Sequence, residues 1–377
     1  MSTRTSWSGH LRVGGSLDAS CCHGADRCTR AGPSLSGPIV ESPVTVKGSP
    51  CGVVPAEKGD EVDVSAVPDE FADTVRAVAR RFGVPDREVT VAPRQGQVNL
   101  TIYLGSDLVL RLPRQRRFEE RLVKEAEVIG LVRDRGIPTA ELVSFDATHE
   151  LGDNSYIVLE RLHGREIGDL PSLADGGDRI YGSLFEILTG LHAIRRDVET
   201  SVRSVGTADF SVEELLDELT SGGEIGRTQA GWLQRWFSLL ESRGARRSEP
   251  VLLHGDVMPS NLILNDSGDV SAIIDWGSAC WGEPMRDLAG FRTSALPDVV
   301  DAYRQVACRQ RTPAEVAALE ASVLWYQLFF ALAKLLGRPS SSETRNWSAP
   351  RGARLLEILR FFTTAVPDRW RQLLQQD

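Results

Sequence analysis

Residues 251–276 constrain the fold more than any other part of the sequence. A polar loop that carries Asp256 and Asn261 lies between two short apolar runs. A tight turn, Asn-Asp-Ser-Gly-Asp, then returns the chain antiparallel into a third apolar run, which ends at Asp275. These three polar side chains are therefore expected to converge at one end of a β-hairpin.

Three oxygen-bearing side chains at one site suit a particular chemistry. Carboxylate and amide oxygens are ligands that Mg²⁺ accepts while it keeps waters and bridges substrate phosphates. Phosphoryl transfer needs positioning, a metal ion and a carboxylate that accepts the proton of the attacking hydroxyl. The pattern therefore predicts a kinase-like site.

Three sequence blocks carry a resemblance to a known family. They read H-G-D-V-M-P-S-N at 254–261, I-D-W at 274–276 and G-E-P-M-R-D-L-A at 282–289. In this order and spacing they resemble the aminoglycoside phosphotransferase family, over roughly residues 68–365. The resemblance implies an α+β, two-lobed protein-kinase-like fold with a small β-rich N-lobe and a larger helical C-lobe.

The resemblance also implies roles for single residues. Asp256 resembles the catalytic base that orients the acceptor hydroxyl, and Asn261 and Asp275 resemble the Mg²⁺ ligands. ATP or GTP would be the phosphate donor. Asp287 resembles a carboxylate that braces the catalytic loop, and Glu283 stands where the family usually has Asp.

The first half of the folded region is expected to be rich in strands. Apolar periodicity predicts a helix over 68–82, strands at 89–91, 98–104 and 108–112, a helix over 118–135, and strands at 142–145 and 155–160. The loop before the second strand has a single glycine, Gly96, and with Asn99 is expected to lie over the nucleotide phosphates. Glu160 and Leu162 resemble the hinge that meets the nucleotide base.

The phosphate-binding lysine of kinases has no counterpart here. Arg111 occupies its place on the third strand, and no lysine lies between Lys58 and Lys124. Arginine stays charged and can bind phosphate in a bidentate manner. Glu125 resembles the helix glutamate that pairs with this cation, and Glu127 is the competing choice.

The second half is expected to be helical. Helical faces occur around 180–191 and 232–240, and further helices fit 297–310, 313–337 and 351–365. Among them we expect one strand pair, 251–253 with 262–264, followed by a strand at 270–274. The resulting division is a disordered tail (1–66), a nucleotide-binding N-lobe (67–162) and a helical C-lobe (163–377) that holds the catalytic loop and the substrate pocket.

Charge and composition argue against nucleic acid and membrane as partners of this protein. A net charge of −9 argues against nucleic-acid binding, and no apolar run reaches the length of a membrane span. Residues 1–20 lack the apolar region of a secretory signal, so a cytoplasmic location is expected. Cys21, Cys22, His23 and Cys28 match no familiar zinc spacing and are interpreted as part of the tail.

The acceptor is expected to be a small molecule with a hydroxyl group, such as an aminoglycoside or another antibiotic. An acidic run, which includes Glu213, Glu214 and Asp217, either holds ammonium groups of such a compound or forms a solvated helix face. The alternative to an active enzyme is a catalytically silent kinase-like protein that binds nucleotide or acts as a scaffold. Arg111 and the loop with one glycine motivate that alternative.

Overall fold

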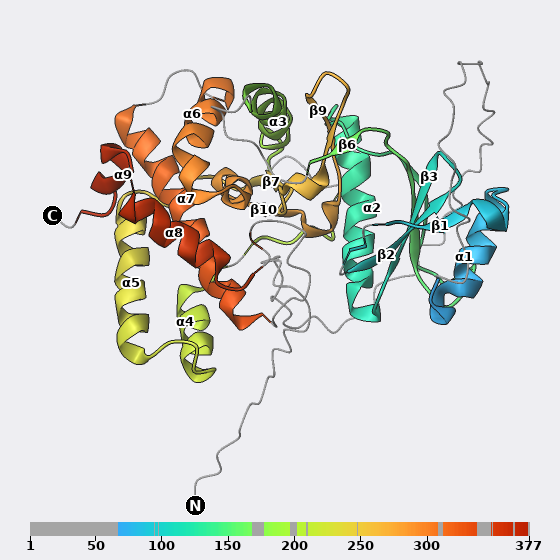
Figure 1. The fold of residues 1–377 in the computed structure, drawn as a ribbon, viewed down its shortest axis with the longest axis horizontal. Coiled ribbons are helices and arrows are strands. Elements are labelled where there is room, and N and C mark those ends of the chain that lie inside the picture. Colours follow the sequence, from blue (N-terminus) through green and yellow to red (C-terminus); the bar gives the residue numbers. More distant parts are fainter. Residues whose placement is uncertain are drawn as a thin grey trace, which may run out of the picture.

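The structure, a computed structural model, describes residues 67–93, 95–96, 98–167, 177–196, 202–208, 210–246, 248–307, 312–337, 348, 350–364 and 366–375. The predicted tail and its cysteine–histidine cluster lie outside the described residues. The described chain forms a small lobe built on a twisted sheet and a larger lobe built mainly of helices (Figure 1). The expected two-lobed α+β fold is confirmed.

The N-lobe is one antiparallel sheet with a helix on each face. The strand order is β1-β2-β3-β5-β4. The strands are β1 (Val89–Val91), β2 (Asn99–Leu104), β3 (Leu108–Pro113), β4 (Leu142–Asp146) and β5 (Tyr156–Glu160), and the helices are α1 (Asp69–Arg81) and α2 (Glu119–Asp134). These elements follow the apolar periodicity of the sequence within two residues at each end.

Strand alternation decides which side chains face which helix. Successive residues of a strand point to opposite faces of the sheet. In β5, Tyr156 and Val158 pack in the cluster with α1, whereas Ile157 and Leu159 pack in the cluster with α2. In β3, Leu110 and Leu112 likewise belong to the α1 side. The same period places Arg111, which lies between them, on the side that α2 covers.

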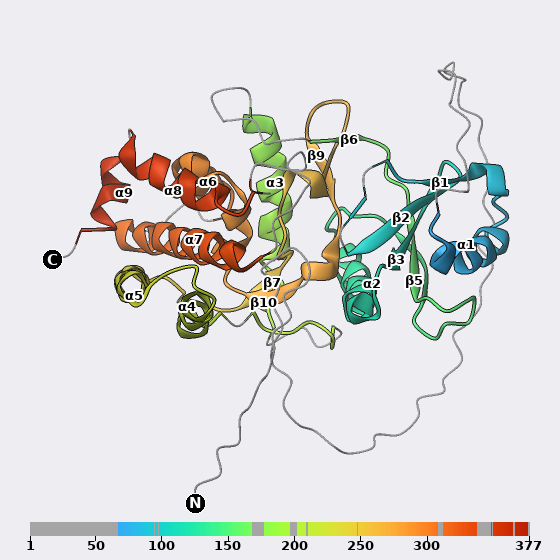
Figure 2. The ribbon, with the colours of Figure 1, turned by 60° about the horizontal axis from the view of Figure 1, so that its bottom comes forward.

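α2 lies between the sheet and the C-lobe and belongs to the hydrophobic core of both (Figures 1 and 2). Its apolar side chains join one cluster with helices of the C-lobe. Any group on the sheet face toward α2 is therefore close to the junction of the two lobes.

The C-lobe is organised around the long helix α7 (Pro313–Ala333). Thr312 begins it with a capping box in which Thr312 and Glu315 satisfy each other's backbone N–H groups. Together with the short turn that follows, this is the one stretch of the described chain long and apolar enough to cross a membrane. Of its most apolar window, 72% is buried inside the protein, as in a core helix. The other helices are α3 (Asp178–Leu191), α4 (Val212–Ser221), α5 (Arg227–Ser242), α6 (Leu296–Ala307), α8 (Ala353–Thr363) and α9 (Asp368–Gln372).

The strands of the C-lobe pair differently from the prediction. β7 (Val251–Leu253) pairs antiparallel with β10 (Cys280–Gly282), and β8 (Leu262–Leu264) pairs with β9 (Val270–Ile273) and with β6 (Arg165–Glu166). The expected pairing of 251–253 with 262–264 is therefore wrong. The intervening loop is too long and too irregular for a hairpin, and it ends in a 3₁₀ turn. The predicted hairpin between β8 and β9 is confirmed.

Candidate active site

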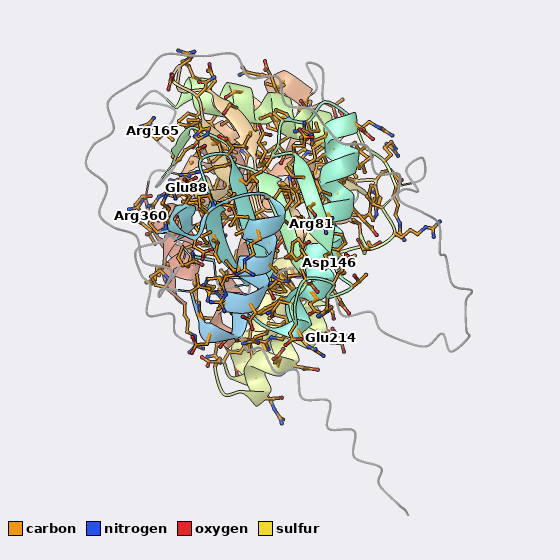
Figure 3. All side chains as sticks on the ribbon, turned by 90° about the vertical axis from the view of Figure 1, so that its right-hand side faces the viewer. Arg81, Glu88, Asp146, Arg165, Glu214 and Arg360 are labelled. Carbon is orange, nitrogen blue, oxygen red and sulfur yellow. The ribbon has the colours of Figure 1, made fainter. Side chains whose placement is uncertain are left out.

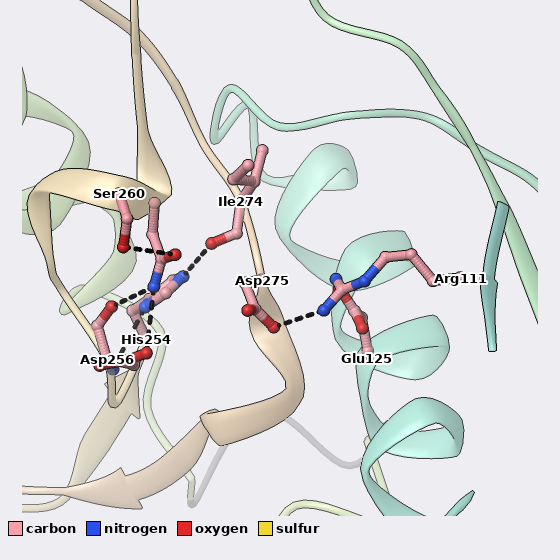
Figure 4. A network of polar contacts seen from close by, with 8 residues as sticks. Arg111, Glu125, His254, Asp256, Ser260, Ile274 and Asp275 are labelled. Carbon is pink, nitrogen blue, oxygen red and sulfur yellow. Dashed lines mark hydrogen bonds and ion pairs between the residues drawn. The ribbon is translucent and has the colours of Figure 1, made fainter. Parts of the chain in front are cut away.

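A cluster of charges joins the two lobes, with Glu125 buried, Arg111 largely buried and Asp275 partly exposed. Arg111 donates from one guanidinium nitrogen to Glu125 of α2 and from another to Asp275 Oδ1, at 2.9 Å (Figure 4). Glu125 is only 1% exposed, so its carboxylate depends on Arg111 for charge compensation. The cluster thus ties β3 and α2 of the N-lobe to the end of β9 in the C-lobe.

The two candidate glutamates of α2 have different partners. Glu125 faces Arg111, whereas the carboxylate of Glu127 accepts from the Ser204 backbone N–H at 2.9 Å and from its hydroxyl at 2.7 Å. Two residues along a helix rotate a side chain by more than half a turn of the helix. Of the two alternatives, the structure therefore pairs Glu125 with the cation of β3.

Burial and mutual attraction set the protonation of this cluster. Burial alone would lower the pKa of Arg111, but Asp275 and Glu125 outweigh it and raise that pKa, so the guanidinium stays charged. Burial raises the pKa of Glu125 to about 7, although Arg111 opposes this shift. The charged form of Arg111 is therefore stabilised more strongly than the charged form of Glu125.

Asp275 occupies an unusual backbone conformation. Its φ of 71° and ψ of 65° place a non-glycine residue in the left-handed region, which costs of the order of 1 kcal/mol or more. The next residue, Trp276, is fully buried and donates from Nε1 to Thr139 Oγ1 at 2.9 Å. This anchored side chain holds the turn that directs Asp275 toward Arg111.

The loop that carries Asp256 is held by a buried carboxylate. Asp287 accepts from the backbone N–H groups of His254 (2.9 Å) and Gly255 (2.8 Å), and it lies 3.1 Å from His192 Nε2. Burial alone would raise the pKa of Asp287, but its hydrogen bond with His192 and nearby positive charge lower it. Asp287 therefore acts as an anion that fixes the backbone just before Asp256.

His254 has a structural role in this loop. Its Nε2 lies 2.9 Å from the Ile274 carbonyl, and its Nδ1 accepts from the Asp256 N–H at 3.3 Å. Burial lowers the pKa of His254, which agrees with a neutral ring that donates at Nε2 and accepts at Nδ1. The ring thereby fixes the loop that carries Asp256 against the strand that leads to Asp275.

Asn261 connects the two ends of the predicted site. Its amide nitrogen donates to the Asp256 backbone carbonyl at 2.9 Å and to Asp256 Oδ2 at 3.1 Å. Its own carbonyl accepts from the Ile274 N–H at 2.9 Å, so Asn261 and Asp275 lie beside each other across the hairpin. The amide oxygen of Asn261 accepts a long contact, 3.4 Å, from Ser260 Oγ.

These groups surround a cleft between the lobes of about 780 Å³. Eight of the nine residues singled out from the sequence line it: Gly96, Asn99, Arg111, Glu125, Glu160, Leu162, Asn261 and Asp275. Asp256 is half-buried beside Asn261 and outside this lining. The backbone N–H of Glu160 donates to the Glu141 carbonyl at 2.9 Å, so this N–H already has a hydrogen-bond partner within the protein.

Sequence reasoning missed several residues of the site. His192 is the residue that follows the end of α3 and is named by no motif, yet it supports Asp287. Gln95 and Arg114 hold the loop around Gly96 through contacts to backbone atoms. Such contacts leave no spacing pattern in a sequence.

The fold and the cleft define the class of a kinase-like phosphotransferase. A profile of the phosphotransferase enzyme family matches residues 90–320, and the chain belongs to this family. The resemblance drawn from the three sequence blocks, and the enzyme class that it implied, are thereby confirmed.

Individual relatives are distant. Viomycin phosphotransferase of Streptomyces vinaceus is 25% identical over 244 residues, which cover 59% of this chain and 79% of that protein. Acyl-CoA dehydrogenase family member 11 of Mus musculus is 24% identical over 227 residues, 55% of this chain but only 28% of that protein. The GDP complex of aminoglycoside 2'-phosphotransferase-IIIa shares the fold with a TM-score of 0.59 and 18% identity, and the match covers 78% of this chain and 98% of that one.

Gly255→Ala is expected to damage the loop that carries Asp256. Gly255 has a φ of 83°, and an added Cβ would lie 2.1 Å from the Ser278 carbonyl oxygen. We expect a loss of about 2 kcal/mol or more of unfolding free energy, measured by urea denaturation. The matched control is Gly182→Ala in α3, where an added Cβ would have no atom within 4 Å apart from the backbone of its own helix. This substitution is expected to be neutral or stabilising. Equal tolerance of both substitutions would contradict this account.

Asp287→Asn is expected to destabilise the fold by about 3 kcal/mol at pH 7, because an amide NH₂ would face a backbone N–H. The folded pKa of Asp287 is depressed, so its contribution is present above the unfolded pKa and is lost as pH falls through the folded value. Urea denaturation should show a constant difference between the variant and the wild type from pH 7 to 5 and a smaller one below about pH 4. A difference that already vanishes at pH 5 would contradict the proposed anion.

Proposed function

We propose that this protein is a Mg²⁺-dependent O-phosphotransferase that moves the γ-phosphate of ATP or GTP to a hydroxyl group of a small molecule. One observation carries the proposal: Arg111, Asn261 and Asp275 line one interlobe cleft, and Asn261 binds Asp256 at its edge. Residues 67–162 would form the nucleotide-binding lobe and 163–377 the lobe with the catalytic loop and acceptor pocket. A cytoplasmic location would supply both nucleotide and Mg²⁺.

Asp256 is proposed as the catalytic base. The acceptor hydroxyl oxygen would bond to the γ-phosphorus as the bond from that phosphorus to the β,γ-bridging oxygen breaks. Asp256 would take the hydroxyl proton, and the nucleoside diphosphate would leave. The hydrogen bond from Asn261 Nδ2 fixes Oδ2 of Asp256, so the carboxylate is oriented before the acceptor arrives.

Asn261 and Asp275 are proposed as the metal ligands. Asn261 directly precedes β8 and Asp275 follows β9, so both lie at one end of the β8–β9 hairpin. Among the described residues, no group of three or more His, Cys, Asp or Glu side chains is placed to hold a metal ion. Mg²⁺ fits such a sparse set because it takes its remaining ligands from water and phosphate. When bound, the ion would neutralise charge on the phosphates.

Arg111, Gly96 and Asn99 are proposed to meet the phosphates, with Glu125 holding the guanidinium of Arg111 in place. Glu160 and Leu162 are proposed to meet the base. Arg111 carries a permanent positive charge on the cleft wall. Its guanidinium can bind phosphate oxygens in pairs, which a lysine ammonium cannot do. The arginine therefore offers a physical substitute for the lysine of other kinases.

The acceptor is proposed to be an aminoglycoside or another antibiotic. Support comes from two relatives whose names are those of antibiotic-modifying enzymes, viomycin phosphotransferase and an aminoglycoside 2'-phosphotransferase. The acidic face of α4 gives little support. Glu213, Glu214 and Asp217 are exposed, and Figure 3 shows Glu214 at the opposite end of the molecule from Arg165, which follows the cleft residue Gly164. The solvated-face interpretation is therefore favoured.

The test is acceptor-stimulated nucleotide consumption with Mg²⁺ and ATP or GTP, screened over aminoglycosides, viomycin-like peptides and macrolides. Asp256→Asn should lower turnover more than about a thousandfold while the protein stays folded. Asp266→Asn, an exposed acid in the β8–β9 turn, is the matched control and should keep wild-type turnover. Undiminished turnover in Asp256→Asn would refute the assignment. Nucleotide binding without turnover on any acceptor would favour the silent kinase-like protein.

A further inference from the structure

The Gln95 side chain in the loop between β1 and β2 forms hydrogen bonds with the backbone of Ala92 and Thr101. The carboxamide of Gln95 lies against the edge of β2, where Nε2 donates to the carbonyls of Ala92 and Thr101, both at 2.8 Å. Its Oε1 accepts from the Thr101 N–H at 3.0 Å. The amide thus makes the hydrogen bonds that a further backbone unit would make in a sheet ladder.

Arg114 completes the attachment from the end of β3. Its NH2 donates to Gln95 Oε1 at 2.9 Å, its Nε donates to the Gly96 carbonyl at 3.1 Å, and its backbone N–H donates to the Val98 carbonyl at 2.8 Å. All donor and acceptor positions of the Gln95 amide are then in use. Gln95 and Gly96 are thereby bonded to β2 and to Arg114, the residue that follows β3.

The same loop borders the cleft. Gln95, Gly96 and Asn99 all line it, together with Arg111, which lies three residues before Arg114. Asn99 is 5% exposed, and its Oδ1 has no hydrogen-bond partner in the part of the chain that the structure describes.

We propose that Gln95 and Arg114 are positioning residues that hold the loop residues Gln95 and Gly96 in a nucleotide-receiving arrangement before nucleotide binds. The inference rests on the proposed function, because it assigns the cleft to a nucleotide. Glycine-rich loops are conformationally free and must be ordered by their ligand, which weakens binding. Here hydrogen bonds of the Gln95 amide and the Arg114 guanidinium hold the segment around Gly96 before nucleotide binds.

The experiment is isothermal titration of the full-length protein with ATP and GTP in Mg²⁺. Gln95→Ala should raise the nucleotide Kd about tenfold, the factor equivalent to 1.4 kcal/mol. Gln95→Glu keeps the length and the acceptor oxygen but loses both donors to Ala92 and Thr101, so it should also weaken binding. Gln115→Ala, at the exposed neighbour of Arg114, is the matched control and should bind as the wild type does.

Two further readouts separate positioning from general damage. The unfolding temperature of Gln95→Ala should stay within about 2 °C of the wild type. The KM for nucleotide should rise while the KM for the acceptor and kcat remain unchanged. Wild-type nucleotide Kd in both Gln95 variants, or parallel loss of nucleotide and acceptor affinity, would overturn the inference. Absence of nucleotide binding by the wild type would instead overturn the proposed function on which it rests.

Discussion

The contact of Arg111 with Glu125 and Asp275 links every part of the site. It brings together a strand and a helix of the N-lobe and the end of a C-lobe hairpin. Removing one partner of the buried Arg111–Glu125 pair costs about 3–5 kcal/mol, because the other charge is left uncompensated. Within this cluster, the Arg111–Asp275 hydrogen bond is the contact that crosses from the N-lobe to the C-lobe.

A second constraint acts on the backbone before Asp256. The carboxylate of Asp287 accepts hydrogen bonds from two successive backbone N–H groups, and Gly255 adopts the positive φ that this turn requires. The neutral ring of His254 fixes the loop to the strand before Asp275. The proposed base and the proposed metal ligands are thus positioned by groups that never meet a substrate. Rigid support of this kind is what a transfer reaction governed by positioning requires.

Much of this arrangement could be predicted from the sequence because it is local. The turn at 265–269 and the apolar runs around it predict the β8–β9 hairpin, and the hairpin brings Asn261 and Asp275 together. Strand alternation places Arg111 on the α2 side. The pairing of β7 with β10 was missed because three-residue strands carry no register signal. Gln95 and His192 were missed because their partners are backbone atoms or distant side chains.

The central proposal is that the cleft binds nucleotide together with a metal ion at Asp275. The decisive measurement is the nucleotide Kd with and without Mg²⁺, in the wild type and in Asp275→Asn, by titration calorimetry. The account predicts that Mg²⁺ tightens nucleotide binding in the wild type and that this gain disappears in the variant. Equal Mg²⁺ dependence in the two proteins would contradict it.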